Sequence, residues 1–322
     1  DIKGIADNLD YIKNLGATAL WLNPVLENNQ EKYSYHGYSI TDFYNIDERF
    51  GSTADYINLI DNCHSRGIKV IKDLIFNHCG SNHWWMKDLP DPDWIHQFSE
   101  YTGSNFRAGS IVDPYASNKD KMKMQNGWFD TTMPDLNQNN PFLANYLIQN
   151  SIWWIEFSGI DGIRMDTQPY PQKEMMSDWA KRIHEEYPNF TLLGEVWVND
   201  QAISSFWFNN WSEDNYKSGL NSIFDFPLNY AIKTGMNEPD GWSTGIIKLY
   251  DALTKDYLYK DPSQITIFGD NHDVERLFSL VGEDYGKFKT VFTFLMTTRG
   301  IPMVYYGTEI IMQGEEHLGH KD

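Results

Sequence analysis

Residues 67–78 read Gly-Ile-Lys-Val-Ile-Lys-Asp-Leu-Ile-Phe-Asn-His, a short and largely apolar run that ends in two polar residues. A helix capped by Ser52 is predicted to precede this run and to end at Gly67. The run itself, at residues 68–76, shows no regular alternation of apolar and polar side chains. Such a strand is buried on both faces, which is typical of a parallel sheet covered by helices.

The same alternation of helix and strand continues on both sides of this segment. Strands are predicted at residues 17–22, 68–76, 162–165, 190–196, 223–226, 265–268 and 302–306. Helices are predicted at residues 4–15, 52–67, 140–159, 171–186, 242–257 and 284–298. Regular alternation of this kind predicts an α/β fold built on a parallel sheet.

Seven predicted strands are one short of the eight that close a (β/α)8 barrel. We therefore predict a TIM (β/α)8 barrel that lacks its first strand and its last helix. We also expect residues 1–322 to be a segment of a longer polypeptide. An open doubly wound sheet is the alternative. It is less favoured because no glycine-rich dinucleotide-binding loop follows an early strand.

The composition narrows the classes of partner. Asp and Glu number 45 against 26 Lys and Arg, which gives a formal net charge of −19. A protein with this negative charge is repelled by the phosphates of nucleic acid and by anionic membranes, so neither is expected as a partner. Aromatic residues make up 15% of the chain, and flat rings suit the stacking of sugars. Cys63 and Cys79 are expected at opposite ends of a βα layer, so no disulfide is predicted between them.

Residues with catalytic potential lie at or just after the carboxyl ends of four of the predicted strands: His78, Asp166, Glu195, and the pair His272 and Asp273. Each one alone is explained equally well as a helix cap or a solvated turn residue. In a barrel, however, the carboxyl ends of the strands meet on one face. Carboxyl groups gathered there indicate acetal cleavage, in which one carboxylate attacks the anomeric carbon and a protonated one serves as the acid. Arg164 would keep the neighbouring Asp166 ionised.

Four segments resemble, in order and spacing, the signature segments of the α-amylase family. They are Asp-Leu-Ile-Phe-Asn-His at 73–78, Gly-Ile-Arg-Met-Asp at 162–166, Gly-Glu-Val-Trp at 194–197 and Phe-Gly-Asp-Asn-His-Asp at 268–273. Supporting segments at 16–24, 35–38 and 300–309 extend the resemblance over essentially the whole chain. That family has a (β/α)8 barrel with a small B domain inserted after the third strand. The resemblance therefore implies a catalytic barrel at residues 1–78 and 139–322 and a B domain at residues 79–138.

The resemblance also implies roles for individual residues. Asp166 matches the nucleophile, Glu195 the general acid/base, and Asp273 the carboxylate that holds sugar hydroxyls and stabilises the transition state. The substrate-binding residues implied in the same way are Tyr38, His78, Arg164, Trp197 and His272. Asp73 and Asn77 are interpreted as structural supports of the site.

Weaker features indicate the branch of the family. Residues 133–137 (Met-Pro-Asp-Leu-Asn) and 166–170 (Asp-Thr-Gln-Pro-Tyr) are similar to neopullulanases and cyclomaltodextrinases. Typical α-amylases carry a Lys-His pair shortly after the nucleophile, where residues 168–170 stand here. An ordinary α-amylase, with its calcium ion between barrel and B domain, is therefore not expected. No cofactor is required for the chemistry, but the resemblance implies a structural calcium ion that uses Asp1.

The implied substrate is an α-glucan oligosaccharide or polysaccharide, cleaved by a retaining mechanism through a covalent glycosyl-enzyme. Starch fragments, pullulan and cyclodextrins all qualify, with α-1,4 bonds as the main target and α-1,6 bonds as a second option. Homodimer formation through domains outside this chain is a further expectation. Two alternatives stay open. One is a transglycosylase on the same barrel. The other is an inactive binding or partner domain, although such relatives typically lose a catalytic carboxylate and all three are present here.

Overall fold

A computed structural model describes residues 1–32, 34–208 and 216–314 of the chain. The chain divides into two compact units. The first unit comprises Asp1–Glu195 and Ser218–Leu220, and the second comprises Val196–Lys217 and Asn221–Asp322. Both units alternate strands with helices, which is the α/β class that the sequence predicts.

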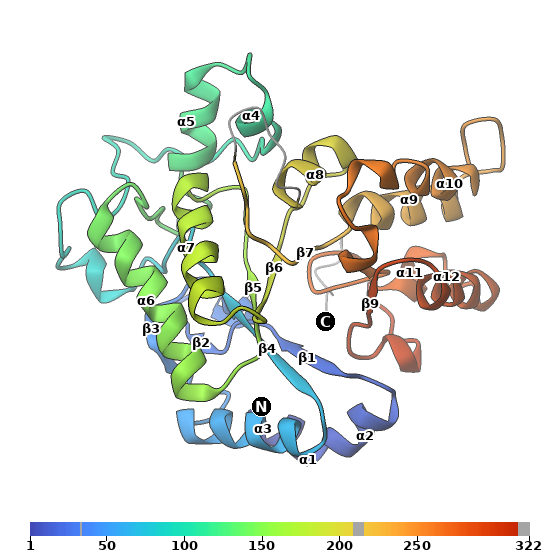
Figure 1. The fold of residues 1–322 in the computed structure, drawn as a ribbon, viewed down its shortest axis with the longest axis horizontal. Helices are drawn as coiled ribbons and strands as arrows, with labels where there is room; N and C mark the ends of the chain where they lie inside the picture. Colours follow the sequence, from blue (N-terminus) through green and yellow to red (C-terminus); the bar gives the residue numbers. More distant parts are fainter. Residues whose placement is uncertain (33, 209–215, 315–322) are drawn as a thin grey trace. The chain divides into compact units, whose positions relative to one another are not determined.

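Parallel strands form the main sheet of the first unit (Figure 1). In spatial order they are β1 (Ala19–Leu22), β4 (Lys69–Leu74), β5 (Gly162–Met165) and β6 (Thr191–Gly194). The register pairs Leu74 with Met165, and Met165 with Gly194. The carboxyl ends of β4, β5 and β6 therefore lie at one edge of the sheet. The residues that follow these three strands are brought together there.

Three long helices accompany this sheet: α3 (Thr53–Ser65), α6 (Pro141–Ser158) and α7 (Lys173–Glu186). Their ends follow the sequence signals closely. Ser52 and Asp55 form a capping box at the start of α3, and Asn140 caps α6, whose first residue is a proline. Trp154 of α6 and Trp179 of α7 are fully buried, so both helices contribute large aromatic side chains to the core.

The N-terminal region differs from the prediction in two ways. The sequence predicts one helix at residues 4–15, but the structure has α1 (Ile2–Asp7) and α2 (Leu9–Asn14). Asn8 separates them, and its side-chain amide donates to the carbonyl of Gly4, a competition with helical bonding that is common for Asn. The loop after β1 contains the 3-10 turn η1 (Ser34–His36) and a short antiparallel hairpin of β2 (Leu26–Glu27) and β3 (Asp42–Ile46), which the sequence analysis does not predict.

The segment between β4 and α6 has little regular structure. It contains the 3-10 turn η2 (Trp84–Met86) and the short helices α4 (Gly109–Val112) and α5 (Asn118–Asn126). Trp85 and Trp94 are buried and meet edge to face with their ring centroids 5.4 Å apart, so aromatic packing supplies a local core. The B domain predicted at residues 79–138 corresponds to this segment, and its standing as a separate domain stays a prediction.

The second unit is built from shorter elements. They are α8 (Gln201–Phe208), β7 (Ser222–Ile223), α9 (Phe226–Asn237), α10 (Ile247–Leu253), η3 (Asp256–Leu258), η4 (Pro262–Gln264), β8 (Thr266–Phe268), α11 (Leu277–Leu280), α12 (Tyr285–Thr297), β9 (Ile301–Met303) and η5 (Thr308–Ile310). Strands β8 and β9 pair in parallel, and Phe224 bridges to Thr266 of β8. Ile267 of β8 packs in an apolar core with Leu228 of α9 and Val291 of α12.

All seven predicted strands are present, as β1, β4, β5, β6, β7, β8 and β9. The helices of the second unit are predicted less well, because α8, α9 and α11 have no counterpart in the prediction. Helix α9 begins at Phe226, where the sequence predicts a strand, since Asp225 caps its first turn and Pro227 follows. The helix predicted at 242–257 is reduced to α10, because Gly245 just before it adopts a φ of 76°.

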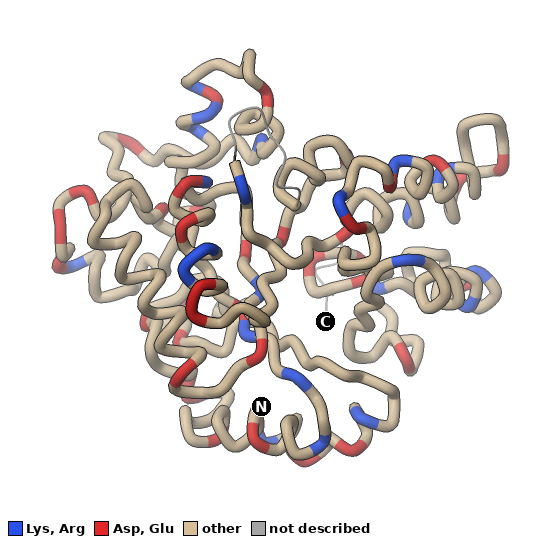
Figure 2. The backbone as a smooth tube through the Cα atoms, viewed as in Figure 1, with Lys and Arg blue, Asp and Glu red and all other residues tan. Residues whose placement is uncertain are grey.

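Acidic residues occur on helices and loops of both units, as Figure 2 shows. Cys63 and Cys79 are both buried and free. Within the part of the chain that the structure describes, every helix is too short or too polar to cross a membrane.

Candidate active site

The guanidinium of Arg164 joins the two carboxyl groups predicted to carry the chemistry. Arg164 lies on β5, Asp166 directly follows that strand, and Glu195 directly follows the neighbouring β6. Nη1 of Arg164 lies 2.7 Å from Oδ1 of Asp166, and Nη2 lies 2.6 Å from Oε1 of Glu195. All three side chains are buried. One planar guanidinium, with a charge-assisted hydrogen bond on each side, thus holds the two carboxyl groups close together.

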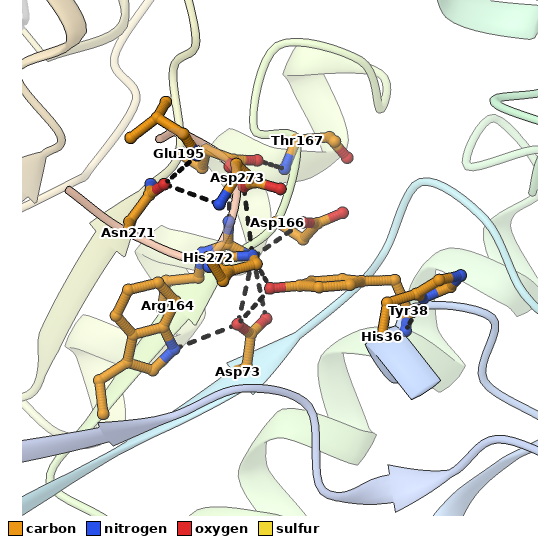
Figure 3. Close-up of polar contacts among 12 residues, drawn as sticks. His36, Tyr38, Asp73, Arg164, Asp166, Thr167, Glu195, Asn271, His272 and Asp273 are labelled. Carbon is orange, nitrogen blue, oxygen red and sulfur yellow. Dashed lines mark hydrogen bonds and ion pairs between the residues drawn. The ribbon is translucent and has the colours of Figure 1, made fainter. Parts of the chain in front are cut away.

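A third carboxyl group, that of Asp73 on β4, shares the same guanidinium (Figure 3). Its two oxygens accept from Nη1 of Arg164 at 3.1 and 3.2 Å. Nε1 of Trp21 and the hydroxyl of Tyr38 donate to it at 3.1 and 3.4 Å. The rings of Trp21 and Tyr38 lie 5.2 and 5.6 Å from Cζ of Arg164, within cation–π range. These contacts fit the interpretation of Asp73 as a support of the site.

Burial and shared charge set the ionisation of this cluster. Burial and, to a smaller extent, the charge of Glu195 raise the pKa of Asp73, and Arg164 lowers it, with the result that this pKa is about 7. Burial lowers the pKa of Arg164, but the charges of Asp73, Glu195 and Asp166 outweigh this effect and hold it well above its ordinary value. One permanent cation therefore faces three carboxyl groups. This excess of acid favours the retention of a proton within the cluster.

Thr167 holds Glu195 in place through a strained backbone, and the sequence analysis does not identify it. Its φ of 44° is unusual for a β-branched residue, and strain of this kind gathers at functional sites. The backbone N–H of Thr167 donates to Oε2 of Glu195 at 2.9 Å, while the N–H of Glu195 donates to the carbonyl of Met165. A threonine one residue past a predicted nucleophile carries no sequence signal for such a backbone, so this role is evident only in the folded structure.

His78 is buried and lies at the end of an aromatic group. Its ring stacks on Phe129 with the centroids 5.4 Å apart, and Phe129 meets Tyr170 at the same distance. Burial, with a smaller effect of His36, lowers the pKa of His78 to about 3, so its imidazole is neutral at ordinary pH. Burial also raises the pKa of the Tyr170 hydroxyl, and the charges of Glu195 and Asp166 raise it further. The aromatic group thus lies within electrostatic reach of the carboxyl cluster.

Trp197, His272 and Asp273 belong to the second unit. Nε2 of His272 lies 3.1 Å from Oδ2 of Asp273. The backbone N–H of Asp273 donates to Oδ1 of Asn271 at 2.8 Å, which fixes the turn after β8. Trp197 stacks on Phe226 with an interplanar angle of 12° and keeps about half of its surface exposed. Of the predicted site residues in the first unit, Tyr38, Asp166 and Glu195 all contact Arg164, while His78 contacts Phe129. In the second unit His272 contacts Asp273, whereas Trp197 contacts Phe226.

Buried polar residues support the turn after β8, and the sequence analysis does not identify their role. Asp270 accepts from the backbone N–H of Leu277 at 2.9 Å and from the hydroxyl of Thr308 at 2.9 and 3.0 Å. Cζ of Arg276 lies 4.1 Å from the ring centroid of Tyr305, a cation–π contact. These contacts tie the turn to the segment after β9.

Asp1, the predicted calcium ligand, caps helix α1. Its Oδ1 accepts from the backbone N–H of Gly4 at 2.6 Å, as an N-cap side chain does. Among the described residues, no three His, Cys, Asp or Glu side chains are grouped as for a metal ion. The structure thus assigns Asp1 a helix-capping role, and its role as a calcium ligand stays a prediction.

Paired, buried carboxyl groups at the ends of parallel strands are typical of a glycoside hydrolase, and comparison with known proteins shows that class. The chain belongs to the α-amylase family: the family described as "Alpha amylase, catalytic domain" matches residues 1–321. The resemblance stated on four sequence segments is thereby confirmed.

Relatives among curated proteins cover nearly all of this chain. It is 32% identical over 321 residues to "Beta/alpha-amylase" of Paenibacillus polymyxa, covering 96% of the chain and 24% of that protein. It is 32% identical over 331 residues to "Alpha-amylase 3" of Dictyoglomus thermophilum, covering 98% and 61%. It is 29% identical over 331 residues to "Neopullulanase 2" of Thermoactinomyces vulgaris, covering 98% and 50%. The chain thus spans 24% to 61% of the length of these relatives.

Solved structures of the α-amylase family also align with nearly all of this chain. An α-amylase from Geobacillus thermoleovorans, solved with acarbose, aligns with a TM-score of 0.83 and 35% identity over 100% of this chain and 67% of its own. A cyclomaltodextrin glucanotransferase with a three-domain arrangement aligns with a TM-score of 0.81 and 28% identity over 100% and 66%. The chain therefore has the fold of an α-amylase catalytic domain.

Proposed function

We propose that the protein is a retaining α-glucan hydrolase. It cleaves α-1,4 glucosidic bonds of starch-derived oligosaccharides, pullulan or cyclodextrins, with α-1,6 bonds as a second target. The bridging of Asp166 and Glu195 by the guanidinium of Arg164 carries this proposal. Retaining glycosidases separate their two carboxyl groups by about 5–5.5 Å, and inverting ones by about 6.5–9.5 Å. One guanidinium with a hydrogen bond on each side favours the shorter separation.

Asp166 is the proposed nucleophile and Glu195 the proposed acid and base. The Asp166 carboxylate attacks the anomeric carbon while the Glu195 carboxyl group gives its proton to the glycosidic oxygen, and the bond to the leaving sugar breaks. Glu195, now ionised, takes a proton from water. That water attacks the anomeric carbon and releases Asp166. Arg164 favours the ionised nucleophile, and the excess of acid around this single cation favours the proton that the first step consumes.

His78 and Tyr38 are proposed to hold the reacting sugar. Nε2 of the buried His78 makes no hydrogen bond within the described residues, so it offers a neutral ring nitrogen to a sugar hydroxyl. Tyr38 packs beside Arg164 and Asp73 and offers its ring to the sugar face. In the second unit, Asp273 and His272 are proposed to grip sugar hydroxyls, and Trp197 to contact the leaving side.

A product analysis tests this function. The full-length protein is incubated with pullulan, starch and cyclodextrins, and the sugars released are identified. Proton NMR in the first minutes distinguishes the anomer that is formed before mutarotation. We expect hydrolysis with initial release of the α-anomer. Initial release of the β-anomer would contradict the retaining mechanism, and no cleavage of any α-glucan would contradict the substrate class.

A transglycosylase is the second candidate, because a structural neighbour of high TM-score is named a glucanotransferase. The two activities share the glycosyl-enzyme and differ in whether water or a sugar hydroxyl resolves it. Incubation with maltotriose separates them by chain length. A hydrolase gives only shorter products, whereas a transglycosylase gives products longer than the substrate in the early phase.

A further inference from the structure

Phe106 combines two features that are unfavourable for an ordinary loop residue. Its φ of 55° lies in the left-handed region, where Gly and Asn are common and bulky residues are rare. Its side chain is 53% exposed, so burial does not compensate for the strain. A backbone outlier with an exposed aromatic side chain points to selection for contact with something outside the chain.

The turn that presents Phe106 is fixed on several sides. Oγ of Ser104 accepts from the backbone N–H of Phe106 at 3.2 Å and donates to the carbonyl of Met124 on α5 at the same distance. Nδ2 of Asn105 donates to the carbonyl of Asp120, also on α5, at 3.0 Å. The backbone N–H of Ser104 donates to the carbonyl of Trp128 at 2.9 Å. The strained conformation is therefore held by surrounding structure.

The ring of Phe106 extends the aromatic group that begins at His78. It meets Phe129 edge to face, with the centroids 5.2 Å apart and an interplanar angle of 89°. It also lies 6.3 Å from the ring of Tyr170. Phe129 and Tyr170 lead to His78 and to the carboxyl cluster, as described above. Phe106 is the most exposed ring of the row formed by His78, Phe129, Tyr170 and Phe106, and it lies at the end of the row away from His78.

We propose that Phe106 is a specificity-determining residue that stacks on a glucose ring of the substrate other than the reacting one. The inference rests on the proposed function. The pyranose ring has apolar faces, and a rigid aromatic ring fixed in advance binds such a face at low entropic cost. A substrate with several α-linked glucose units gains this contact, and a single glucosyl unit does not. Phe106 thereby favours oligosaccharides over shorter substrates.

The experiment compares Phe106→Asn with the wild type on two substrates. Asn tolerates the positive φ, so the melting temperature should stay the same or rise. α-Glucosyl fluoride occupies only the reacting position, and its kcat/KM should change by less than about twofold. For maltoheptaose we expect KM to rise about tenfold with kcat little changed, a size typical of losing a buried aromatic contact. The Phe106→Trp variant, which keeps an aromatic ring at this position, should have a kcat/KM for maltoheptaose close to that of the wild type.

Tyr115→Asn is the matched control. Tyr115 lies in the same segment between β4 and α6, is 94% exposed, and belongs to no aromatic contact of the row. Its replacement should leave both substrates unaffected. Equal binding of maltoheptaose by the wild type and Phe106→Asn, measured by calorimetry, would overturn the proposal while leaving the hydrolase intact. A lower melting temperature with equal losses on both substrates would also overturn it. A wild type that neither cleaves nor binds any α-glucan would overturn both this proposal and the proposed function.

Discussion

Strand β4 carries two neighbouring buried charges on opposite faces, and their surroundings differ. Asp73 faces the active-site cluster, where Arg164, Trp21 and Tyr38 all donate to it. Lys72 faces helices α3 and α6. Its Nζ lies 3.8 Å from the ring centroid of Trp154 and 4.8 Å from that of Tyr56, and it has no hydrogen-bond acceptor among the described residues.

The comparison shows two ways in which a buried charge is accommodated. On the inner face of β4, which is the face toward the active-site cluster, hydrogen bonds and opposite charges compensate for the lost hydration of several buried ionisable groups. Buried ionisable groups of this kind are common at catalytic sites. On the face of β4 toward α3 and α6, the rings of Trp154 and Tyr56 are the groups in contact with the ammonium of Lys72. Burial accordingly lowers the pKa of Lys72 to about 7, while Asp73 raises it slightly. We expect the inner charges to matter for activity and the outer charge to reduce stability.

The largest effects are expected from Asp166 and Glu195, the two carboxyl groups in the active-site cluster that are proposed to act on the substrate. Asp166→Asn and Glu195→Gln should each lower hydrolysis of maltoheptaose by several orders of magnitude, because both remove a group that acts in the transition state. With α-maltosyl fluoride, whose leaving group needs no acid, Glu195→Gln should still release fluoride rapidly in a first turnover and Asp166→Asn should not. Stopped-flow fluoride detection measures this. Asp178→Asn, on the exposed face of α7, serves as the control, and equal bursts from both active-site variants would show that the roles are wrong.

Removal of the shared cation should damage both activity and stability. Arg164→Met leaves three buried carboxyl groups without a counter-ion, and breaking a buried ion pair in this way costs about 3–5 kcal/mol of the free energy of unfolding. Urea denaturation measures the loss. Arg182→Met, which breaks the exposed pair with Asp178, should cost less than about 1 kcal/mol. Similar small losses in both variants would contradict the importance given to the cluster.

Replacing the outer charge should have the opposite sign. Lys72→Met keeps the apolar contacts with Trp154 and Tyr56 and removes the buried ammonium group. Replacement of buried ions by apolar side chains often stabilises proteins by about 1–4 kcal/mol, and we expect a gain of this order at pH 6 with activity retained. Lys69→Met, on the same strand but exposed and paired with Asp161, should give no gain. A destabilised Lys72→Met variant would mean that the aromatic rings compensate fully for burial of the charge.

The smallest effects concern the pH dependence of stability. The folded-state pKa of Asp73 is raised to about 7, so its stabilising effect is present at low pH and is lost as pH rises toward 7. The folded-state pKa of Lys72 is lowered to about 7, so its effect is lost as pH falls from about 10 toward 7. Urea unfolding between pH 5 and pH 9 should show the acid slope reduced in Asp73→Asn and the alkaline slope reduced in Lys72→Met. Unchanged slopes in both variants would disprove these ionisation states.

The sequence predicts the strands far better than the details around them, and it predicts which residues make up the candidate site. Short apolar runs between turn signals identify each strand, and polar residues directly after 68–76 and 162–165 identify the site. The break at Asn8 and the start of α9 at Phe226 depend on single side-chain bonds and caps that periodicity does not reveal. The strained backbones of Thr167 and Phe106 are set by surrounding tertiary contacts, so no local pattern predicts them.

The most direct test of the account is to identify the residue that becomes glycosylated. The Glu195→Gln variant is incubated with α-maltosyl fluoride, denatured and digested, and its peptides are examined by mass spectrometry. We predict that one peptide gains the mass of a maltosyl group and that fragmentation places it on Asp166. A maltosyl group on Asp273 or on any other residue, or no adduct while fluoride is still released, would contradict the central claim that Asp166 is the nucleophile of a retaining hydrolase.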